Sequence, residues 1–258
     1  MAKLSAERET PKRGTPKAGA PKRGAPRGRP EPRGAGPVLT VRRWLLRALW
    51  AALAFAVLLI VLFKFVNPPT TPYMFSERLR LGHVDQRWTP ISKIAPVMAR
   101  SVVAAEDANF CEHWGFDMAA IRAAAEAGAH RGGSTISQQV VKNVFLWQGH
   151  SWVRKALEAA LTPMVELIWG KRRILEIYLN VAELDEGGFG VAAGAARYFR
   201  AEPDRITAQQ AALLAVMLPD PKGRDAAHPT SYLRQRAAEV EDGAATIRID
   251  GRAKCFED

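Results

Sequence analysis

The sequence predicts a mainly α protein in which a helical domain follows one membrane-spanning helix near the N-terminus. Apolar residues recur at helical spacing through most of the chain after residue 90, and alternating strand patterns are scarce. An unbroken apolar run precedes this region. The 258 residues, 48% of them apolar, suffice for one domain with a full core plus extensions.

Residues 1–43 form a basic segment with 12 Lys and Arg against 3 Glu, so it carries +9 of the net charge of +11. The segment is rich in Pro, Gly and Ala and has few side chains that can form a core, which predicts disorder. Dense positive charge attracts phosphates, but no aromatic side chain is interleaved to stack on bases. We therefore expect a solvated cytoplasmic tail and no nucleic-acid partner.

Residues 44–66 are predicted to span a membrane. Twenty-three helical residues at about 1.5 Å each reach roughly 34 Å, enough for a hydrocarbon core of about 30 Å, and Arg47 and Lys64 lie near the ends, where they can snorkel. A cleaved signal peptide is the alternative, but the basic region before it is unusually long and the following "NPPTTPY" lacks a small-x-small cleavage pattern. The preceding positive charge predicts a cytoplasmic N-terminus and export of residues 67–258.

The exported part is predicted to be mostly helical. In the segment "KRRILEIYLN" and just beyond, Ile174, Ile177, Tyr178 and Val181 follow helical spacing and are expected to face a core. The same kind of spacing, interrupted by Gly, Pro or Asp, predicts helices within 92–107, 117–129, 135–147, 151–161, 171–183, 190–199 and 207–218.

Two single-residue features in this part lead to further expectations. Pro163 should break or restart the helix that begins near Ser151. The two cysteines, Cys111 and Cys255, are too few for a disulfide framework. Although His113 is close to the first cysteine, no second pair follows at a distance suited to zinc, so structural or incidental roles are expected.

The stretch "GGSTISQQVVKN", residues 132–143, has the pattern of a specialised helix start. Thr135 followed by Gln138 fits a capping box after a glycine turn, and the spacing of Ser134, Gln138 and Lys142 places them on one helical face. Free N–H groups, hydroxyls and a lysine can receive phosphate or sugar hydroxyls. The stretch lacks the Gly-Lys-Ser/Thr ending of a P-loop, and capping with packing alone is the alternative interpretation.

Two neighbouring segments supply carboxylates. Upstream, "EDANFCEHWGFD" (106–117) sets acidic residues beside aromatics where a helix passes into a loop, as a general acid or base with a raised pKa requires. Downstream, "RKALE" (154–158) sets a glutamate beside two cations, which would suit an anionic leaving group.

These motifs, followed by "KRRILEIYLN" and "GVAAGAARYF", occur in the order found in the peptidoglycan glycosyltransferases, and from about Tyr73 to Pro229 the chain resembles the monofunctional biosynthetic transglycosylases. The single anchor and the absence of a following penicillin-binding domain indicate that branch. The resemblance implies a lysozyme-like helical glycosyltransferase domain over 67–235, with a membrane-embedded lobe. It leaves 236–258 as a C-terminal tail to which no role is assigned.

The resemblance also implies an activity, the polymerisation of lipid II into glycan strands at the bacterial inner membrane, with the catalytic domain in the periplasm. The GlcNAc 4-hydroxyl of lipid II would attack the undecaprenyl-pyrophosphate-linked donor chain with inversion. Membrane lipids and other cell-wall synthesis or division proteins are the further partners expected. No cofactor is expected, except that a magnesium or manganese ion is an option near Glu158 through the pyrophosphate.

By the same resemblance, Glu106 is the general base, and Glu158 assists departure of the pyrophosphate, whose charge Lys142, Arg154 and Lys155 stabilise. Alternatively, Lys155 pairs with a nearby carboxylate. The candidates for substrate binding are Asp107, Phe110, His113, Gly133, Ser134, Thr135, Gln138, Gln139, Lys142, Asn143, His150, Arg154 and Lys155. Of the first-motif residues, Asp107, His113 and Asp117 also suit a purely scaffolding role.

His150 departs from the family pattern, which usually has arginine there. Since histidine is largely neutral at pH 7 and lacks arginine's forked donors, weaker or pH-dependent binding of the donor pyrophosphate is expected. Two other functions stay open from the sequence. A lysozyme-like lytic enzyme would share the fold and the catalytic glutamate without needing the cationic motifs, and a membrane-anchored scaffold would need no catalytic residue.

Overall fold

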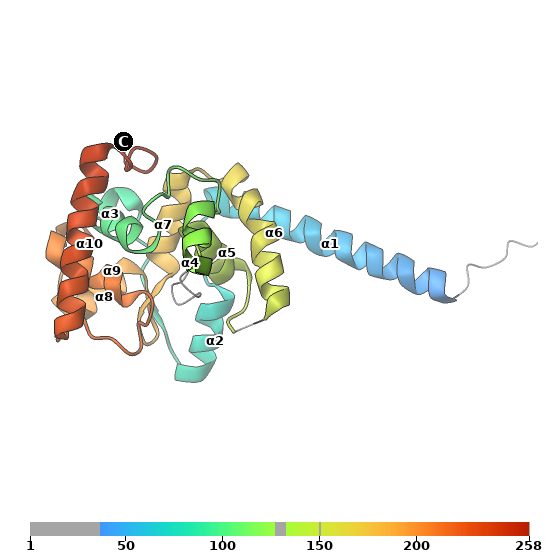
Figure 1. The fold of residues 1–258 in the computed structure, drawn as a ribbon. Coiled ribbons are helices and arrows are strands. Elements are labelled where there is room, and N and C mark those ends of the chain that lie inside the picture. The colour runs from blue at the N-terminus through green and yellow to red at the C-terminus, as the bar shows by residue number, and fades with distance from the viewer. Residues whose placement is uncertain (1–36, 127–132, 150, 258) are drawn as a thin grey trace, which may run out of the picture. The chain divides into compact units, whose positions relative to one another are not determined.

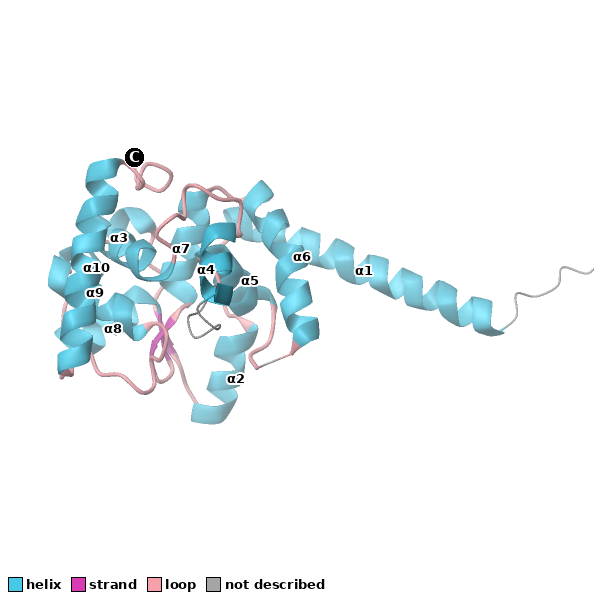
Figure 2. Cartoon of the chain, viewed as in Figure 1, coloured by secondary structure: helices cyan, strands magenta, loops and turns pink. Residues whose placement is uncertain are grey.

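The computed structural model describes residues 37–126, 133–149 and 151–257, and it confirms the mainly α fold (Figures 1 and 2). Residues 1–47 and 48–258 form separate compact units. Of the first, the described part is the beginning of helix α1. The tail expected over residues 1–43 lies largely outside the described residues, as does His150.

The described elements are ten α-helices, two 3₁₀ helices and three short strands. The strands form one sheet of order β1-β3-β2, with β3 parallel to β1 and antiparallel to β2. The bounds are α1 (Pro37–Phe65), α2 (Pro72–Leu81), β1 (Asp85–Gln86), η1 (Ile91–Lys93), α3 (Pro96–Glu106), α4 (Met118–Glu126), α5 (Ile136–Phe145), α6 (Trp152–Ile168), α7 (Lys171–Val181), β2 (Glu183–Asp185), β3 (Gly188–Phe189), α8 (Gly190–Phe199), η2 (Pro203–Arg205), α9 (Ala208–Met217) and α10 (Ser231–Asp250).

Helix α1 is long and apolar enough over Thr40–Phe65 to cross a membrane. Its end agrees within one residue with the predicted span, whereas the helix itself begins earlier, at Pro37. Most of the side chains in its apolar window are exposed. A helix in the core of a soluble domain would bury them, so the exposure favours a single membrane anchor.

The last turns of α1 belong to the core of the second unit. Ile60 is fully buried, and the Trp169 indole donates a hydrogen bond of 2.7 Å to its carbonyl. The Arg173 guanidinium donates to the carbonyls of Phe63, at 2.9 and 3.1 Å, and of Val66, at 3.1 Å. These carbonyls include groups that a helix C-terminus leaves without an intrahelical partner, so Arg173 caps the anchor.

The helical domain is built from two groups of packed helices. Helix α3 packs against α9 and α10, while α5 packs against α6 and α7, and the small sheet lies against α8 (Figure 2). On α7, the four side chains predicted to face a core, Ile174, Ile177, Tyr178 and Val181, are all buried. The helical periodicity of that segment is therefore confirmed.

Pro163 neither breaks nor restarts a helix, so that prediction is wrong. Helix α6 continues through it from Trp152 to Ile168. Proline removes one backbone donor and leaves the carbonyl of Ala159 without its helical partner. Both residues are exposed, so the proline ring and the freed carbonyl lie at the surface of the helix and not in the packed core.

The end of the chain also differs from expectation. The boundary expected at residue 235 falls inside α10, which buries Leu233, Ala237, Val240, Ala244 and Ile247 against the domain. A disulfide joins Cys111 to Cys255 across 144 residues of sequence. Residues 236–258 are thus integrated into the domain at least as far as residue 257, because α10 supplies core side chains and the disulfide secures the residues beyond that helix.

Candidate active site

Glu106 is the last residue of α3 and lines a cleft of about 760 Å³. The cleft brings together α3, the start of α5, the loop after α9 and the first half of α10. Its lining residues are Ala105, Glu106, Ser134, Gln139, Lys142, Pro219, Tyr232, Gln235, Arg236 and Glu239. Four of them come from α10, a helix that the sequence motifs did not mark as part of a site.

One hydrogen bond orients the Glu106 carboxylate, and a second orients its donor. The Gln139 side-chain amide donates to Oε2 of Glu106 at 2.7 Å, and the Tyr178 hydroxyl donates to Oε1 of Gln139 at 3.0 Å. Burial raises the pKa of Glu106, although the hydrogen bond from Gln139 and the charge of Lys142 oppose the shift. A carboxylate with a raised pKa, held in one orientation beside a cleft, is suited to act as a general base.

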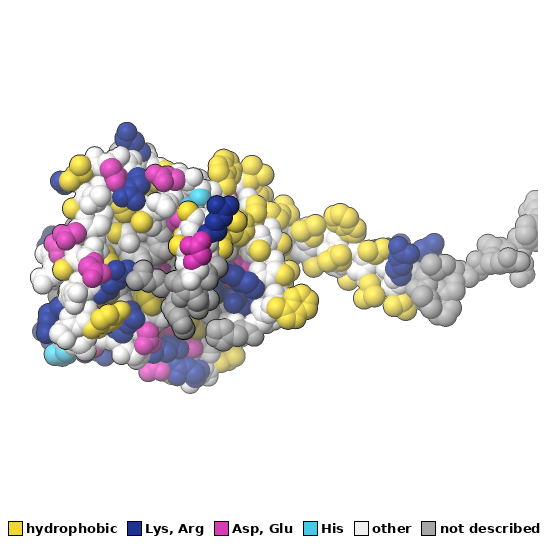
Figure 3. All heavy atoms as spheres, in the orientation of Figure 1, with side chains coloured by type: hydrophobic (Ala, Val, Ile, Leu, Met, Phe, Trp, Pro, Cys, Tyr) yellow, Lys and Arg dark blue, Asp and Glu magenta, His cyan; other side chains and the backbone are white. Residues whose placement is uncertain are grey.

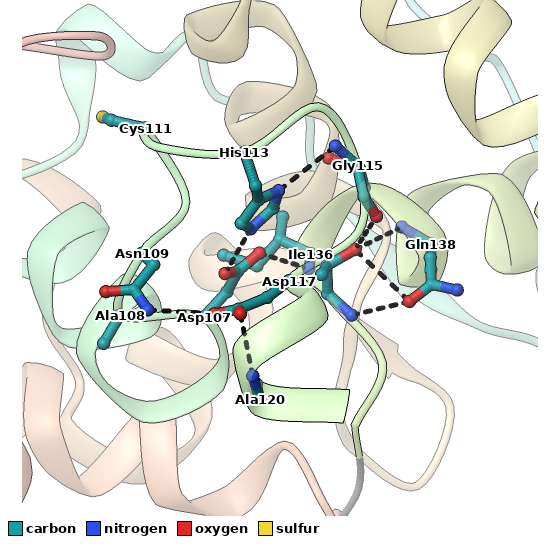
Figure 4. Close-up of polar contacts among 12 residues, drawn as sticks. Asp107, Ala108, Asn109, Cys111, His113, Gly115, Asp117, Ala120, Ile136 and Gln138 are labelled. Atoms are coloured by element: carbon teal, nitrogen blue, oxygen red, sulfur yellow. Dashed lines mark hydrogen bonds and ion pairs between the residues drawn. The ribbon is translucent and has the colours of Figure 1, made fainter. Parts of the chain in front are cut away.

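Asp107, the next residue, serves the scaffold. Its carboxylate accepts a hydrogen bond of 3.0 Å from the backbone N–H of Ile136 and lies 2.7 Å from Nε2 of His113 (Figure 4). The N–H of Gly115 donates to Nδ1 of His113, so in the neutral ring Nε2 carries the proton and donates to Asp107. The Asp107 carboxylate thereby ties the loop after α3 to the first residue of α5.

Asp117 caps the other end of this loop. Its carboxylate accepts from the N–H of Ala120 at 2.8 Å and from the side-chain amide of Asn109 at 2.9 Å (Figure 4). These hydrogen bonds lower the pKa of Asp117, and the bond from the N–H of Ala120 has the largest effect. Asp107, His113 and Asp117 all have the scaffolding contacts that the alternative interpretation expected.

The capping box at the start of α5 is confirmed, but of the three residues predicted to share one face only Ser134 and Lys142 line the cleft. Thr135 accepts from the N–H of Gln138, and the side chain of Gln138 returns to the N–H of Thr135 at 3.1 Å, which leaves Gln138 only 4% exposed. Ser134 precedes the helix. A capping box requires the side chain at its fourth residue to turn back, so Gln139, one position later, faces the cleft instead.

Near Lys142, two further basic side chains, Arg154 and Lys155, pair with the buried Glu158. Arg154 lies 2.7 Å from one oxygen of Glu158, and Lys155 donates to the other oxygen and, at 3.1 Å, to Ser134. Burial lowers the pKa of Lys142, while the charge of Glu158 opposes the shift. Three basic side chains and one buried carboxylate leave excess positive charge, which is suited to an anion.

In this arrangement, Glu158 has no free carboxylate oxygen to offer a divalent cation. Magnesium and manganese need oxygen atoms that are free to coordinate them, and both oxygens of Glu158 are engaged by Arg154 and Lys155. Within the described ranges, no group of three or more His, Cys, Asp or Glu side chains is placed to hold a metal ion.

The remaining candidates lie in different surroundings. Phe110 is fully buried, with Nζ of Lys171 4.4 Å from its ring centroid, so it lies in the core instead of lining the cleft. Asn143 lines a smaller cavity beside Lys142 and accepts a hydrogen bond from Gln148. Two further candidates line a groove together with the carboxylates of the first motif, and these are Gly133 and Thr135.

Behind the first motif lies a buried network of polar side chains that the sequence analysis does not predict. Ser137 donates to the Glu166 carboxylate, and Nζ of Lys171 lies 2.7 Å from both Glu166 and the carbonyl of His113. The only sequence feature that points to this network is the position of Lys171 as the first residue of the motif "KRRILEIYLN". Helical periodicity cannot reveal a pairing between side chains on different helices.

Comparisons with known proteins agree on the family to which this chain is similar. Residues 75–244 match a family model described as Transglycosylase. A protein named biosynthetic peptidoglycan transglycosylase from Jannaschia sp. (strain CCS1) is 59% identical over 84% of this chain and 90% of that protein. Proteins of the same name from Caulobacter vibrioides and Rhodospirillum centenum are 42% and 45% identical, over 83% of this chain and 96% of each relative.

Proposed function

We infer that this chain, which belongs to the transglycosylase family and builds peptidoglycan glycan strands, uses Glu106 as the general base of an inverting glycosyl transfer. The observation that carries this inference is a buried, oriented carboxylate that lines a cleft with Lys142. Beside this cleft, Arg154 and Lys155 pair with the buried Glu158, and Lys155 also donates to Ser134 of the lining. Lipid II is the acceptor, and the donor is the growing chain on undecaprenyl pyrophosphate.

On the acceptor side, the GlcNAc 4-hydroxyl would lie against Glu106. The carboxylate removes the hydroxyl proton as the oxygen attacks the anomeric carbon, a step for which a positioned base contributes typically about 10²–10⁴-fold. Gln139 and Tyr178 hold the carboxylate in place, so they are positioning residues for this step.

On the donor side, Lys142, Arg154 and Lys155 would receive the pyrophosphate. Negative charge grows on that group as the glycosidic bond breaks, and fixed cations stabilise it most in the transition state. Glu158 holds the last two cations in position from within the fold. We propose that these side chains supply the charge without a resident divalent cation, so that a chelator leaves the rate unchanged.

The anchor and the domain surface fit lipid-linked substrates. Figure 3 shows hydrophobic side chains along the surface of α6, where Trp152 is 82% and Leu167 76% exposed. We propose that this face meets the membrane, that residues 67–258 are exported, and that the enzyme works at the periplasmic face of the inner membrane. Other cell-wall proteins are proposed partners by family resemblance alone.

The activity test is incubation of detergent-solubilised protein with labelled lipid II, with products resolved by gel. The wild type should form long, lysozyme-sensitive glycan, and Glu106→Gln should form almost none. Glu202→Gln, which changes an exposed glutamate before η2, is the matched control and should polymerise normally. If Glu106→Gln polymerised at the wild-type rate, its role as base would be refuted.

A lytic enzyme is the second candidate function, and it would release muropeptides from purified sacculi without consuming lipid II. The cationic cluster argues against it, because hydrolysis of a glycan has no pyrophosphate leaving group to stabilise. A non-catalytic scaffold would tolerate Glu106→Gln in the cell.

A further inference from the structure

The chain folds back after α10 into a turn, residues 251–257, which we call the C-terminal clasp (Figure 1). It reaches the loop that follows the catalytic helix α3 at three points. Arg252 donates a hydrogen bond of 3.0 Å to the carbonyl of Ala108. The ring of Phe256 lies 6.4 Å from the ring of Phe110, and Cys255 forms the disulfide with Cys111.

The other side of the clasp is held by the domain. Phe256 is 1% exposed, and Arg172 of α7 donates to its carbonyl at 2.8 Å. The Glu257 carboxylate lies 2.6 Å from the guanidinium of Arg100 on α3. The clasp is therefore a fixed support to which the loop is attached, because α3 and α7 secure it independently of the loop.

The loop needs such a support because it is made of turns between α3 and α4. Phe110, held between Phe256 and the Lys171 ammonium, fixes the middle of the loop. Lys171 holds the carbonyl of His113, whose ring holds Asp107. A shift of the loop would thus move Asp107 and, with it, the neighbouring Glu106 relative to α5.

We propose that the C-terminal clasp is a positioning element for the catalytic base, and that the Cys111–Cys255 disulfide locks the first-motif loop in the geometry that presents Glu106 to the acceptor. This inference rests on the proposed role of Glu106. It assigns a catalytic purpose to a part of the chain that lies outside the sequence motifs, and it makes the rate depend on the oxidation state of two cysteines.

The redox step is ordinary thiol–disulfide exchange. Dithiothreitol attacks one sulfur of the disulfide, then closes on itself. The protein bond accepts two electrons and two protons to give two thiols, and dithiothreitol is oxidised to its cyclic disulfide. The step needs no further reactant.

The test compares oxidised and dithiothreitol-treated full-length enzyme on lipid II, at a temperature where circular dichroism shows both forms folded. Reduction should lower kcat about tenfold, as expected when a reacting group is misplaced by a fraction of an ångström, with KM changed less than about twofold. The double variant Cys111→Ser/Cys255→Ser should match the reduced enzyme and be insensitive to dithiothreitol, which controls for effects of the reagent.

The pH profile separates positioning from simple stabilisation. The hydrogen bond from Gln139 lowers the pKa of Glu106, so a displaced Glu106 should lose activity at a higher pH on the acid side. Reduction should therefore move the acid limb of the kcat profile to higher pH. If the clasp merely stabilised the fold, reduction would lower the melting temperature and leave kcat and the acid limb of the folded enzyme unchanged. That result would overturn the proposal.

A milder variant keeps the proposal testable if reduction unfolds the protein. Arg252→Ala removes the hydrogen bond to Ala108 at the surface and should lower kcat severalfold. Arg248→Ala, an exposed arginine four residues earlier, is the matched control and should not. If Arg252→Ala keeps the wild-type kcat while Glu106→Gln is inactive, the positioning role of the clasp is refuted and the role of Glu106 stands. If Glu106→Gln is active, the proposed role of Glu106 as the base is refuted.

Discussion

At the scale of single residues, the proposed chemistry of the cleft depends on how the residues around Glu106 set the pKa of its carboxyl group. The charged groups that face it are Asp107 beside it, Lys142 of α5 and Arg224 of the loop before α10, while Gln139 donates to it directly. Burial is the largest influence and raises the pKa. A general base must be deprotonated to act, so the rate should rise with pH through this raised pKa.

Removing the Gln139 amide tests this balance. Gln139→Ala deletes a donor that favours the charged carboxylate, so the pKa of Glu106 should rise further. The acid limb of kcat should then move to higher pH, and kcat at neutral pH should fall about tenfold. The measurement is kcat for lipid II across about pH 4.5–8, with exposed Gln209→Ala of α9 as control. An unmoved limb would contradict the orientation by Gln139.

At the scale of elements, two helices begin with the same device in different surroundings. Thr135 caps α5 and Thr207 caps α9, each with a glutamine three residues later. Thr135 is 3% exposed and its hydroxyl also donates to the carbonyl of Gly115 at 2.7 Å, whereas Thr207 is exposed. The buried cap therefore joins two motifs, and the exposed cap serves only its own helix.

The two caps make a matched pair for mutation. Thr207→Ala should cost about 1 kcal/mol of stability, as cap removal typically does. Thr135→Ala should cost about 2 kcal/mol or more, because it also leaves a buried carbonyl without its donor. Thermal unfolding measures both, at roughly 2–4 °C per kcal/mol for a domain of this size. Equal losses would show that the Gly115 contact contributes nothing.

At the scale of the whole molecule, the last turns of α1 are packed into the same compact unit as the catalytic domain. Arg173 donates to two carbonyls of the last turn of α1 and pairs with Glu176 at 2.6 Å. Ile60 is part of the core. We expect these contacts to help position the catalytic domain at a bilayer.

Arg173→Met should therefore impair the enzyme most where a bilayer is present. Polymerisation in liposomes should fall about tenfold, since orientation contributes to positioning of the reacting groups, whereas the rate in detergent micelles should fall less. Arg205→Met, which changes an exposed arginine of η2, is the control for lost charge. The same fractional loss in both environments would contradict the orienting role.

The apolar helix of the anchor, the helical class and the capping box of α5 could be predicted from the sequence. These follow from hydrophobic periodicity and from short spacings, which act within one or two turns of a chain. Even there, the expectation for Pro163 was wrong, because α6 continues through a proline whose ring lies at the helix surface. The choice of Gln139 over Gln138 for the cleft was also local, since the capping box occupies the earlier side chain.

Contacts between residues far apart in the sequence depend on the tertiary structure. The bond from Tyr178 to Gln139, the contact of Lys155 with Ser134 and the disulfide of Cys111 with Cys255 join segments 21 to 144 residues apart in the sequence. Such pairings depend on how whole helices pack, and no pattern within one segment records them. The final residues resemble a tail for this reason, because their partners lie on α3, on α7 and in the first-motif loop.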